Sequence, residues 1–369
     1  MLISSDSLKR VVVALLQQGG SALPEAQDVA DHLVGANLTG HDSHGVGMLP
    51  IYVRNLKSGM LVPNQPVALA RQDGSILMFD GQYGYGQSVA KQAMEQALTR
   101  CQETGLVLMT LRNAHHIGRI GTYGEQAIAA GCVSLHFVNV TDHSPLVAPY
   151  AGSDARFATN PICIAMPGSE TQPPLLLDMA TSRVALGKVR VALNKGETLK
   201  EGLLIDHHGQ PSRDPSVMEG YLFPEREDLK PKGALLPMGD YKGYGLAMFC
   251  ELLGGMLSGG GTIEPGNERR GGIVNNMMTI LMDPARLVEP SWMERNVADL
   301  VSYFKASPPA DPSNPVQVAG DPERATRAAR EAQGVPVDDT TWEQILSAME
   351  ALGGSRETLL KLAEAPGSA

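Results

Sequence analysis

Two histidines, an acid and a hydroxyl lie between two glycines in the segment GHDSHG, residues 40–45. Histidine is the side chain best suited to give and take a proton near neutral pH. Polar residues gathered on a turn after a helix are typical of sites carried by a rigid scaffold. The segment therefore predicts a site of proton transfer. The alternative is a capping cluster in which Asp42 and Ser43 satisfy backbone donors.

A second segment, NAHHIGRIG at residues 113–121, follows a predicted buried strand. Gly118, Gly121 and Gly124 recur every three residues, and a glycine-rich turn before a helix exposes backbone N–H groups to an anion such as a pyrophosphate. Adjacent histidines can also bind a metal, but no third ligand lies at metal spacing nearby, so we expect no metal. The alternative is a packed turn with one solvent-facing and one core histidine.

A carboxylate and a lysine stand in two further segments. Asp178, in LDMATS at residues 177–182, ends an apolar run in which an unpaired carboxylate is costly. It can orient a histidine and stabilise its cation, or it can cap the helix that follows. Lys242, in DYKGYG at residues 240–245, opens an apolar helix and suits a phosphate or a carboxylate, unless it is an ordinary surface lysine.

The segment GYGQSVA, residues 84–90, resembles the dinucleotide fingerprint GxGxxG/A. That fingerprint requires an acid about 20 positions later, after a second strand. The acid near that position, Glu103, precedes a predicted strand, so we interpret the segment as a tight turn. Arg54 and Arg156 are candidates to hold a substrate carboxylate in a bidentate fork, although most arginines only solvate a surface.

Hydrophobic periodicity and turn residues predict the elements that position these groups. A first helix is capped by Ser5 or Asp6, and a second begins near Pro24 and ends near Gly40. Strands are predicted at residues 67–70, 75–79, 106–111, 133–140 and 275–282. Helices are predicted at residues 88–101, 123–130 and 241–257, from residue 321 and from a capping box at 341–344, with loops over 200–240.

This order of elements predicts an α/β fold with a mixed central sheet. Helices at both ends of the chain suggest one discontinuous helical domain, residues 1–70 plus 283–369. Residues 71–282 would form the central α/β domain that binds cofactor and substrate. A chain of 369 residues is long enough to bury a sizeable core.

Composition excludes several partners and locations. The formal charge is −10 and no run of Lys and Arg occurs, so we expect no nucleic-acid partner. No stretch of about 18 apolar residues occurs, so we expect no membrane span. The four cysteines form no CxxC pair, and the first residues lack the basic start of a signal peptide. These features predict a cytoplasmic protein with reduced cysteines.

Five segments resemble those of the malate/lactate/sulfolactate/ureidoglycolate dehydrogenase-like oxidoreductases, in the same order and over nearly the whole chain. They are residues 40–45 (GHDSHG), 115–121 (HHIGRIG), 159–161 (TNP), 177–182 (LDMATS) and 242–257 (KGYGLAMFCELLGGML). Five segments in order are far more specific than any one of them. GHDSHGVGM, HHIGRIG and LSGG look especially like the hydroxycarboxylate dehydrogenase branch of this family.

The resemblance implies a nicotinamide-binding fold unlike the Rossmann fold, with a mixed or mostly antiparallel central sheet. It implies a homodimer whose active site lies between domains, close to the subunit interface. It also implies hydride transfer between NAD or NADP and C2 of a 2-oxo or 2-hydroxy acid. The cofactor is then expected along His116, Gly118, Gly121, Thr159, Asn160, Asp178, Ala180, Ser182 and Lys242.

By the family pattern His44 is the proton donor to the carbonyl oxygen, Asp178 supports it, and His116 is the other candidate acid/base. Many relatives carry an arginine four residues after the counterpart of His44, where it binds the substrate carboxylate. This chain has Met48 there. An apolar residue disfavours small dicarboxylates such as malate and favours a bulkier or less charged substrate.

Other residues are expected near the substrate. Arg54 or Arg119 would replace the missing arginine clamp, and Ser43 lies beside the proton donor. His143 stands just before the proline of TDHSP, where some relatives have a lysine or a short polar stretch. It is either a second acid/base group or a loop residue.

The expected reaction is reduction of a 2-oxo acid, and its reverse, with protonated His44 as the acid and Asp178 holding the positive charge. One alternative is a reductase of a cyclic imino acid, pyrroline- or piperideine-2-carboxylate. Another is a catalytically inactive dinucleotide-binding protein. The sequence leaves open the substrate side chain, NAD or NADP, the stereochemistry at C2 and the physiological direction.

Overall fold

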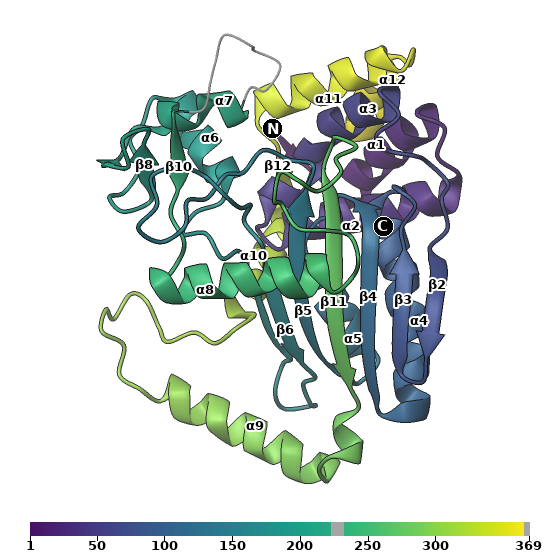
Figure 1. Ribbon diagram of the computed structural model, residues 1–369, viewed down its shortest axis with the longest axis vertical. Helices are drawn as coiled ribbons and strands as arrows, with labels where there is room; N and C mark the ends of the chain where they lie inside the picture. Colours follow the sequence, from purple (N-terminus) through teal and green to yellow (C-terminus); the bar gives the residue numbers. More distant parts are fainter. Residues whose placement is uncertain (223–231, 365–369) are drawn as a thin grey trace.

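Apolar strands from distant parts of the chain pair into one seven-stranded sheet in the computed structural model, which describes residues 1–222 and 232–364 (Figure 1). The strand order is β2-β3-β4-β11-β5-β6-β7, and only the β3–β4 pairing is parallel. The strands are β2 (Ala68–Asp73), β3 (Ile76–Asp80), β4 (Leu106–His115), β5 (Val133–Thr141), β6 (Ile162–Met166), β7 (Leu175–Met179) and β11 (Val274–Met282). The predicted mixed sheet is confirmed.

The central strand β11 comes late in the chain yet pairs between β4 and β5. It is buried along most of its length, because helices cover both faces of the sheet. Its register against β4 shifts between Asn275 and Met277, which is a β-bulge. Beside the bulge the Asn276 side chain accepts a hydrogen bond from the backbone of Asn113, 3.0 Å away, just before the two histidines.

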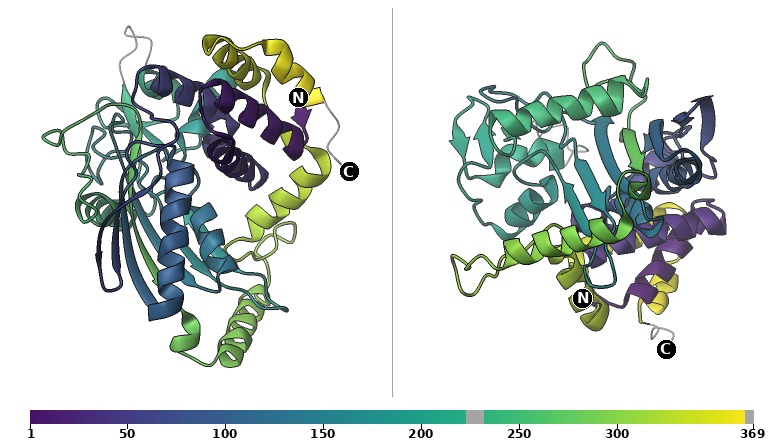
Figure 2. Two further views of the ribbon diagram at one scale, coloured as in Figure 1. Left: turned by 90° about the vertical axis from the view of Figure 1, so that its right-hand side faces the viewer. Right: turned by 90° about the horizontal axis from the view of Figure 1, so that it is seen from below.

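Helices α4 (Gly86–Thr104) and α5 (Gly121–Ala129) cover one face of the sheet, and α8 (Tyr241–Cys250) crosses the other (Figures 1 and 2). Close packing explains the glycines of the segment 84–90. A Cβ on Gly86 would lie 2.0 Å from the backbone oxygen of His115, so α4 starts directly against the end of β4. Residues 86–90 form the start of α4, so the interpretation of the segment 84–90 as a tight turn was wrong for most of its length.

Both ends of the chain contribute to one helical group, with its own apolar core (Figure 2). It contains α1 (Ser5–Gln18), α2 (Leu23–Leu38), α3 (Leu49–Lys57), α11 (Asp339–Ala351) and α12 (Arg356–Glu364). The short strands β1 (Leu2–Ile3) and β12 (Val335–Pro336) pair antiparallel and tie the two ends together.

A third core belongs to a small lobe beside the sheet, part of which falls in the region expected to be loops. The lobe holds α6 (Leu186–Lys195), β8 (Leu204–Asp206), β9 (Pro211–Ser212), η3 (Pro215–Met218), α7 (Glu219–Leu222) and β10 (Gly233–Leu235). The expectation of loops over 200–240 was therefore wrong for β8, β9, η3, α7 and β10, each of which is too short to give a periodic signal. Helix α6 precedes that range and was not predicted. Residues 223–231 of that region lie outside the described residues.

Helix α9 (Pro290–Lys305) stands apart from the other helices along the lower edge in Figure 1 and leads through residues 306–320 to α10 (Asp321–Gln333). Only Val301 of α9 is buried. A helix with so little buried surface contributes little to the stability of a single chain, because helical stability comes mainly from packing of an apolar face.

Three details of the helix ends correct the sequence expectations. Ser4, not Ser5 or Asp6, caps α1 by accepting from the backbone of Ser7. Asp338, not the predicted capping box at 341–344, caps α11. The predicted helix over 241–257 is α8 followed by a π-helix, η4 (Glu251–Met256). π-Helical turns are rare and occur mostly at functional sites.

Candidate functional site

Four side chains form a hydrogen-bonded chain from the protein interior to a half-exposed histidine. Gln87 Nε2 donates to Tyr52 Oη at 2.6 Å, and Tyr52 Oη lies 2.6 Å from His116 Nδ1. His116 Nε2 in turn lies 3.2 Å from His44 Nδ1, and the two imidazole rings stack with centroids 5.3 Å apart. Gln87, Tyr52 and His116 are buried, whereas His44 is partly open to solvent. We call these four residues the histidine chain.

The turn that carries His44 is fixed from both sides. His44 ends η1 (Asp42–His44), which precedes η2 (Val46–Met48). Asn37 of α2 donates to Asp42 Oδ1 at 2.7 Å and accepts from the backbone of Val46 at 2.9 Å. Arg330 of α10 forms a bidentate pair with Asp42, at 2.6 and 2.9 Å. Asp42 therefore holds the turn through side chains and does not cap it, as the alternative interpretation required.

Burial sets the protonation of both histidines. It lowers the pKa of His44 to about 4, while the nearby Asp178 carboxylate raises it and His41 and Arg119 lower it further. Burial also lowers the pKa of His116 well below its ordinary value, and the proximity of His44 adds to that shift. Both imidazoles are therefore neutral near pH 7, in contrast to the protonated His44 that the expected mechanism started from.

Asp178 lies at the core of a second cluster. Its Oδ2 accepts from the backbone N–H of Gly121 at 2.8 Å and lies 3.4 Å from Arg119 Nε. Arg119 is 1% exposed and also pairs with Glu125 at 2.8 Å. Asp178 thus caps the start of α5 and not the helix that follows it in sequence, so the capping alternative named the wrong helix. Its influence on His44 is exerted through space.

The two histidines of HHIGRIG are both buried, which corrects the alternative of one solvent-facing ring. His115 Nε2 lies 2.9 Å from Asn55 Nδ2. Gly118 has φ +74°, and a Cβ there would lie 2.3 Å from His32 Nε2, which accepts from the backbone of Arg119 at 2.8 Å. Glycine at 118 is therefore required by the backbone conformation and by the contact with His32.

Six of the residues expected along the cofactor lie in the 159–161 segment, at the end of β7 and just after it, and at the start of α8. The other three, His116, Gly118 and Gly121, lie between the end of β4 and the start of α5. Thr181 donates from its backbone and its hydroxyl to the Thr159 carbonyl, 2.9 Å in each case. An isolated bridge pairs Ser182 with Pro237, just before α8. Lys242 is exposed in the first turn of α8. Ala180, which follows β7 in the sequence, is half-buried.

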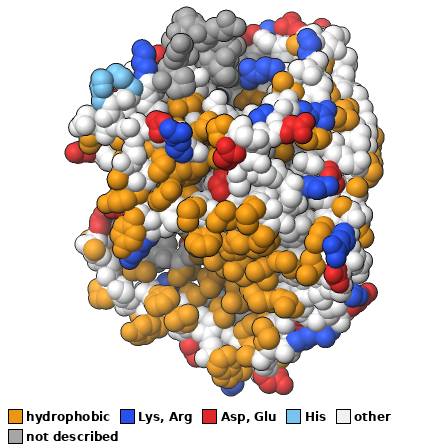
Figure 3. Space-filling view, in the orientation of Figure 1, with side chains coloured by type: hydrophobic (Ala, Val, Ile, Leu, Met, Phe, Trp, Pro, Cys, Tyr) orange, Lys and Arg blue, Asp and Glu red, His pale blue; other side chains and the backbone are white. Residues whose placement is uncertain are grey.

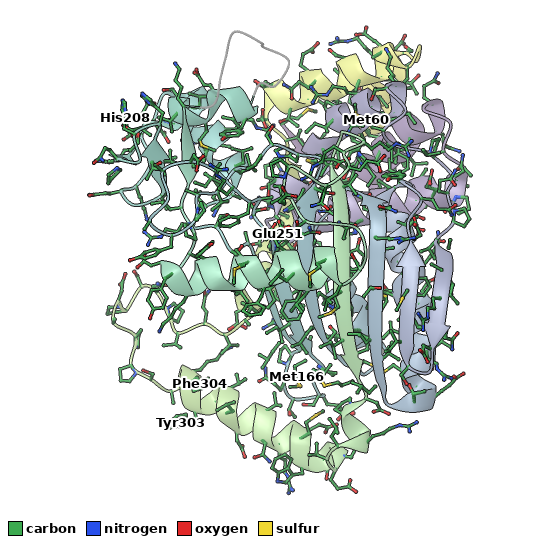
Figure 4. The ribbon with its side chains drawn as sticks, in the orientation of Figure 1. Met60, Met166, His208, Glu251, Tyr303 and Phe304 are labelled. Atoms are coloured by element: carbon green, nitrogen blue, oxygen red, sulfur yellow. The ribbon has the colours of Figure 1, made fainter. Side chains whose placement is uncertain are left out.

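Asn160 connects this region to a buried carboxylate. Its Nδ2 donates to Glu251 Oε1 at 2.9 Å, and Asn139 donates to Glu251 Oε2 at 3.0 Å. The backbone of Ile263 donates to the same Oε2, also at 3.0 Å. Asn276 donates to Asn139 Oδ1 at 3.0 Å. We call these residues the Glu251 network, which lies where the α8–η4 helix crosses the sheet (Figure 4).

The residues expected at the substrate fall in different places. A Cβ on Gly187 of α6 would lie 3.1 Å from Ser43 Cβ, so the small lobe contacts the His44 turn. Met48 packs against the helical core. His143 lies near enough to His116 to affect its pKa, and it contacts the Ser144 carbonyl through Nδ1 at 2.7 Å.

The two arginines proposed as replacement clamps, Arg54 and Arg119, lie in different surroundings. Arg54 is exposed on α3, two residues after the buried Tyr52, and residues two apart point to different sides of a helix. The structure therefore does not bring Arg54 to the histidine chain. Arg119 is close to Asp178, but its charge is already matched by two carboxylates.

Sequence reasoning missed Tyr52, Gln87 and Glu251 as parts of these networks. No role was predicted for Tyr52, and Gln87 stood inside the segment 84–90, which was interpreted as a tight turn. Glu251 gave a signal, because a carboxylate within an apolar helix needs a partner. Its partners come from β5 and the 159–161 segment, which only the fold brings together.

Two features are absent from the described parts of the chain, a group of side chains placed to hold a metal ion and a helix able to span a membrane. Within residues 1–222 and 232–364, no group of three or more His, Cys, Asp or Glu side chains is placed to hold a metal ion. Over the same residues no helix combines the length and apolar character needed to cross a membrane.

Comparisons with known proteins agree on one family. The sequence pattern of the malate/L-lactate dehydrogenase family matches residues 3–346. Hydroxycarboxylate dehydrogenase B of Escherichia coli (strain K12) is 41% identical over 357 residues, which is 96% of this chain and 95% of that protein.

Solved structures extend the comparison. An Escherichia coli structure described provisionally as a malate/lactate dehydrogenase superposes with a TM-score of 0.91 and 40% identity, over 98% of each chain. The Δ1-piperideine-2-carboxylate reductase of Pseudomonas syringae pv. tomato shares the fold, with a TM-score of 0.78, 24% identity and coverage of 94% of this chain and 99% of that one.

Proposed function

The chain belongs to the malate/L-lactate dehydrogenase family, and from that premise we propose that it interconverts 2-hydroxy acids and 2-oxo acids by hydride transfer with a nicotinamide dinucleotide. The family places the chain among oxidoreductases that act on CH–OH groups. The observation that carries the finer proposal is the position of His44, at the open end of a buried hydrogen-bonded chain and within the field of Asp178.

His44 is the acid/base of the proposed mechanism. Its Nδ1 faces His116, so the proton exchanged with the substrate oxygen is the one at Nε2. With a pKa of about 4, His44 is a base at neutral pH and takes the hydroxyl proton as the alcohol is oxidised. The imidazolium that forms is stabilised by Asp178, and in the reverse direction it returns the proton to the carbonyl oxygen. When bound, the nicotinamide accepts or supplies the hydride.

The residues near the start of α8 fit an extended anionic cofactor. Lys242 is exposed there, and the N-termini of α6 and α8 lie next to the paired Ser182 and Pro237 segments. Helix N-termini and lysines both favour a pyrophosphate. We propose that Thr159, Asn160, Ala180, Ser182 and Lys242 line this part of the cofactor and that Gly118, Gly121, His116 and Asp178 lie toward its nicotinamide end.

The sheet supports binding unlike that of a Rossmann fold. A Rossmann sheet is mostly parallel and holds the dinucleotide at a switch point between parallel strands. Here one of the sheet's pairings is parallel and the rest are antiparallel. We also propose that the helical group and the central α/β region are separate domains, 1–70 plus 283–369 and 71–282, with the His44 turn at their boundary.

The substrate proposed is a 2-oxo acid whose far end is apolar or bulky. Met48, not an arginine, follows His44 at the position expected to bind a second carboxylate, and Arg119 is neutralised by Asp178 and Glu125. His143 and Ser43 remain proposed substrate contacts.

We further propose that the protein is a homodimer. Apolar side chains gather across the face that carries α8 and α9 (Figure 3), and Tyr303 and Phe304 lie near the end of α9 (Figure 4). Exposed members include Met248, Phe249, Met256, Leu257, Trp292, Leu300, Tyr303 and Phe304. Exposed apolar surface of this extent is typical of protein–protein contacts. A cytoplasmic location is part of the same proposal, supported by four free, buried cysteines.

The test is oxidation of NADH and of NADPH against a panel of 2-oxo acids and cyclic imino acids. The panel contains pyruvate, oxaloacetate, phenylpyruvate, hydroxyphenylpyruvate, pyrroline-2-carboxylate and piperideine-2-carboxylate. Fastest turnover with a bulky 2-oxo acid supports the proposal. Fastest turnover with oxaloacetate contradicts the role given to Met48.

A second candidate function is reduction of a cyclic imino acid, favoured by the shared fold of the piperideine-2-carboxylate reductase. Turnover with the cyclic imines alone would select it while keeping the fold and the cofactor. Tight binding of NADH or NADPH with no turnover of any panel member would instead indicate a catalytically inactive dinucleotide-binding protein.

A further inference from the structure

The histidine chain has a direction, because the nitrogen of Gln87 at its buried end can only donate. Gln87 Nε2 donates to Tyr52 Oη, so the Tyr52 hydrogen is free for His116 Nδ1. His116 is then a neutral ring with its hydrogen at Nε2, and that hydrogen points to His44 Nδ1. In this outward direction neutral His44 carries its own hydrogen at Nε2. That nitrogen then donates to a substrate oxygen but has no lone pair to accept a proton.

An imidazolium at His44 demands the opposite direction. Both nitrogens of protonated His44 carry hydrogen, so its Nδ1–H must donate to His116 Nε2. His116 must then carry its hydrogen at Nδ1 and donate to Tyr52 Oη. The Tyr52 hydroxyl can therefore donate only to a further acceptor, and the chain runs inward. Each step follows from the rule that a hydrogen bond has one donor and one acceptor.

Gln87 holds the acceptor that the inward direction requires. Its Oε1 is buried and has no hydrogen-bond partner among the described residues. Rotation of the terminal amide exchanges Oε1 and Nε2, which places the oxygen toward Tyr52. Gln87 is 2% exposed, so water does not readily replace either group. An unpartnered buried carbonyl is costly, and a role in a second arrangement of the chain accounts for its presence.

We propose that Gln87 is a positioning residue whose amide sets the direction of the histidine chain and so decides whether His44 presents an Nε2 hydrogen or an Nε2 lone pair to the substrate. The inference rests on the proposed function, in which His44 is the acid/base. Gln87 touches neither substrate nor cofactor in this account and acts only through Tyr52 and His116.

The proton balance of the step is simple. In oxidation the substrate O–H bond breaks, its proton bonds to His44 Nε2, and the electron pair of the C2–H bond leaves as hydride to the oxidised nicotinamide. No proton travels along the chain beyond His44, because Gln87 can supply none. The step takes place with the chain inward throughout, because both the His44 base with a free Nε2 lone pair and the imidazolium carry hydrogen at Nδ1. The outward and inward arrangements contain the same number of hydrogens and differ in the tautomers of His44 and His116, in the direction of the Tyr52 hydroxyl and in the orientation of the Gln87 amide.

The charged and titratable groups around the histidine chain affect the protonation of His44 and His116, and they are present in every variant compared. His41, Asp178 and Arg119 act on His44, and His32, His115 and His143 act on His116. Of these, only Asp178 favours the cation. Substitutions at Gln87 leave all of them in place, so a change in His44 that follows a change at Gln87 reports on the chain.

Two substitutions are expected to lock the chain in opposite directions. Gln87→Met leaves the Tyr52 hydroxyl no acceptor except His116 Nδ1, which fixes the outward direction. Gln87→Glu, as a carboxylate at pH 8, can only accept from Tyr52, which fixes the inward direction. Gln96→Met is the matched control, because Gln96 is exposed on the same helix, α4.

The direct readout is ¹⁵N NMR of the imidazole nitrogens in histidine-labelled protein, with the His44 signals assigned from their loss in His44→Ala. We expect the Nε2–H form of His44 in Gln87→Met and the Nδ1–H form in Gln87→Glu, with Gln96→Met identical to the wild type. The same His44 form in both Gln87 variants, with folding confirmed by thermal unfolding, would overturn the inference.

Kinetics provide the second readout. We expect kcat for hydroxy-acid oxidation to fall about 10- to 100-fold in Gln87→Met, with KM for the cofactor unchanged and activity largely restored in Gln87→Glu. Equal losses in both variants would overturn the positioning role. Because the NMR measurement needs no substrate, opposite His44 forms in a protein without turnover would defeat the proposed function and leave the directional chain intact.

Discussion

The two buried polar networks of this molecule differ in what their hydrogen bonds permit. In the Glu251 network, amide and backbone N–H groups all donate toward one carboxylate, and a carboxylate only accepts. Its direction is fixed. In the histidine chain, two imidazoles, a hydroxyl and an amide can each exchange donor for acceptor. The two networks are neighbours through Asn275 of β11. Its side chain accepts from the backbone of Ile117, one residue after His116, at 2.9 Å and donates to the Asn139 carbonyl at 3.0 Å.

This difference matches the roles that we propose for the two networks, which are structural for the Glu251 network and catalytic for the histidine chain. The Glu251 network joins the 159–161 segment, β5 and the π-helix η4, so its single arrangement fixes three pieces of backbone that are distant in sequence. The histidine chain joins α3, α4, the end of β4 and the His44 turn, and its two arrangements place the hydrogen of neutral His44 on Nε2 or on Nδ1. We infer that the fixed network shapes the region proposed for the cofactor, whereas the reversible chain permits the proton exchange proposed at His44.

Removal of the reactive end should have the largest effect. We expect His44→Ala to lower kcat about 10²- to 10⁴-fold, the usual contribution of general acid–base catalysis, with cofactor affinity nearly unchanged. Steady-state kinetics and fluorescence titration with NADH or NADPH measure the two quantities. A variant with wild-type turnover would remove His44 from the mechanism and with it the contrast between the networks.

Substitutions in the Glu251 network should mainly lower the stability of the fold. Glu251→Ala leaves buried donors of Asn139, Asn160 and Ile263 without an acceptor, so we expect a loss of about 3 kcal/mol in the free energy of unfolding and weaker cofactor binding. Glu251→Gln keeps one acceptor and should lose less. Urea denaturation measures both. If Glu251→Gln were as damaging as Glu251→Ala, the number of satisfied donors would not be what matters.

The pH dependence of the two directions should diverge because His44 has a pKa of about 4 in the free protein. The base form predominates above that value, so kcat/KM for oxidation of a hydroxy acid should be flat from pH 5 to 8. Reduction needs the protonated form, so its kcat/KM should fall about tenfold for each pH unit over the same range. Parallel profiles for the two directions would contradict the assignment of His44.

A smaller effect should follow from the departure at position 48. Met48→Arg restores the positive charge that many relatives carry there, and an arginine binds a carboxylate in a bidentate fork. We expect kcat/KM for oxaloacetate to rise about tenfold relative to phenylpyruvate, as one new charge-assisted contact is worth roughly 1.5 kcal/mol. Met60→Arg on the same helical region is the control. An unchanged ratio would place the substrate's far end away from residue 48.

Sequence patterns located the elements and clusters whose signal is local. The periodic strands and most helices were found because burial repeats along them, and the segments around His44, His115 and Asp178 stood out by residue type. The short strands of the small lobe gave no period. The caps at Ser4 and Asp338 were misplaced by one to three residues, because several neighbouring polar residues could each serve.

The partnerships could not be predicted, because they join residues far apart in the chain. Tyr52 and Gln87 are 35 positions apart, and Asn139 and Glu251 are 112 apart. Asp178 was expected to orient a histidine, with capping of the following helix as the alternative. The helix that it caps is α5, whose first residue lies 57 positions earlier. Contacts of this kind depend on strand order, above all on the insertion of β11 between β4 and β5.

The measurement that tests the central claim most directly is transfer of deuterium from the reduced nicotinamide to the product. The wild-type protein is supplied with NADH or NADPH deuterated at C4 on either face, together with the fastest 2-oxo acid of the panel. The account predicts that one face delivers its deuterium to C2 of the 2-hydroxy acid, observed by NMR. A product with no deuterium at C2 from either face would contradict direct hydride transfer.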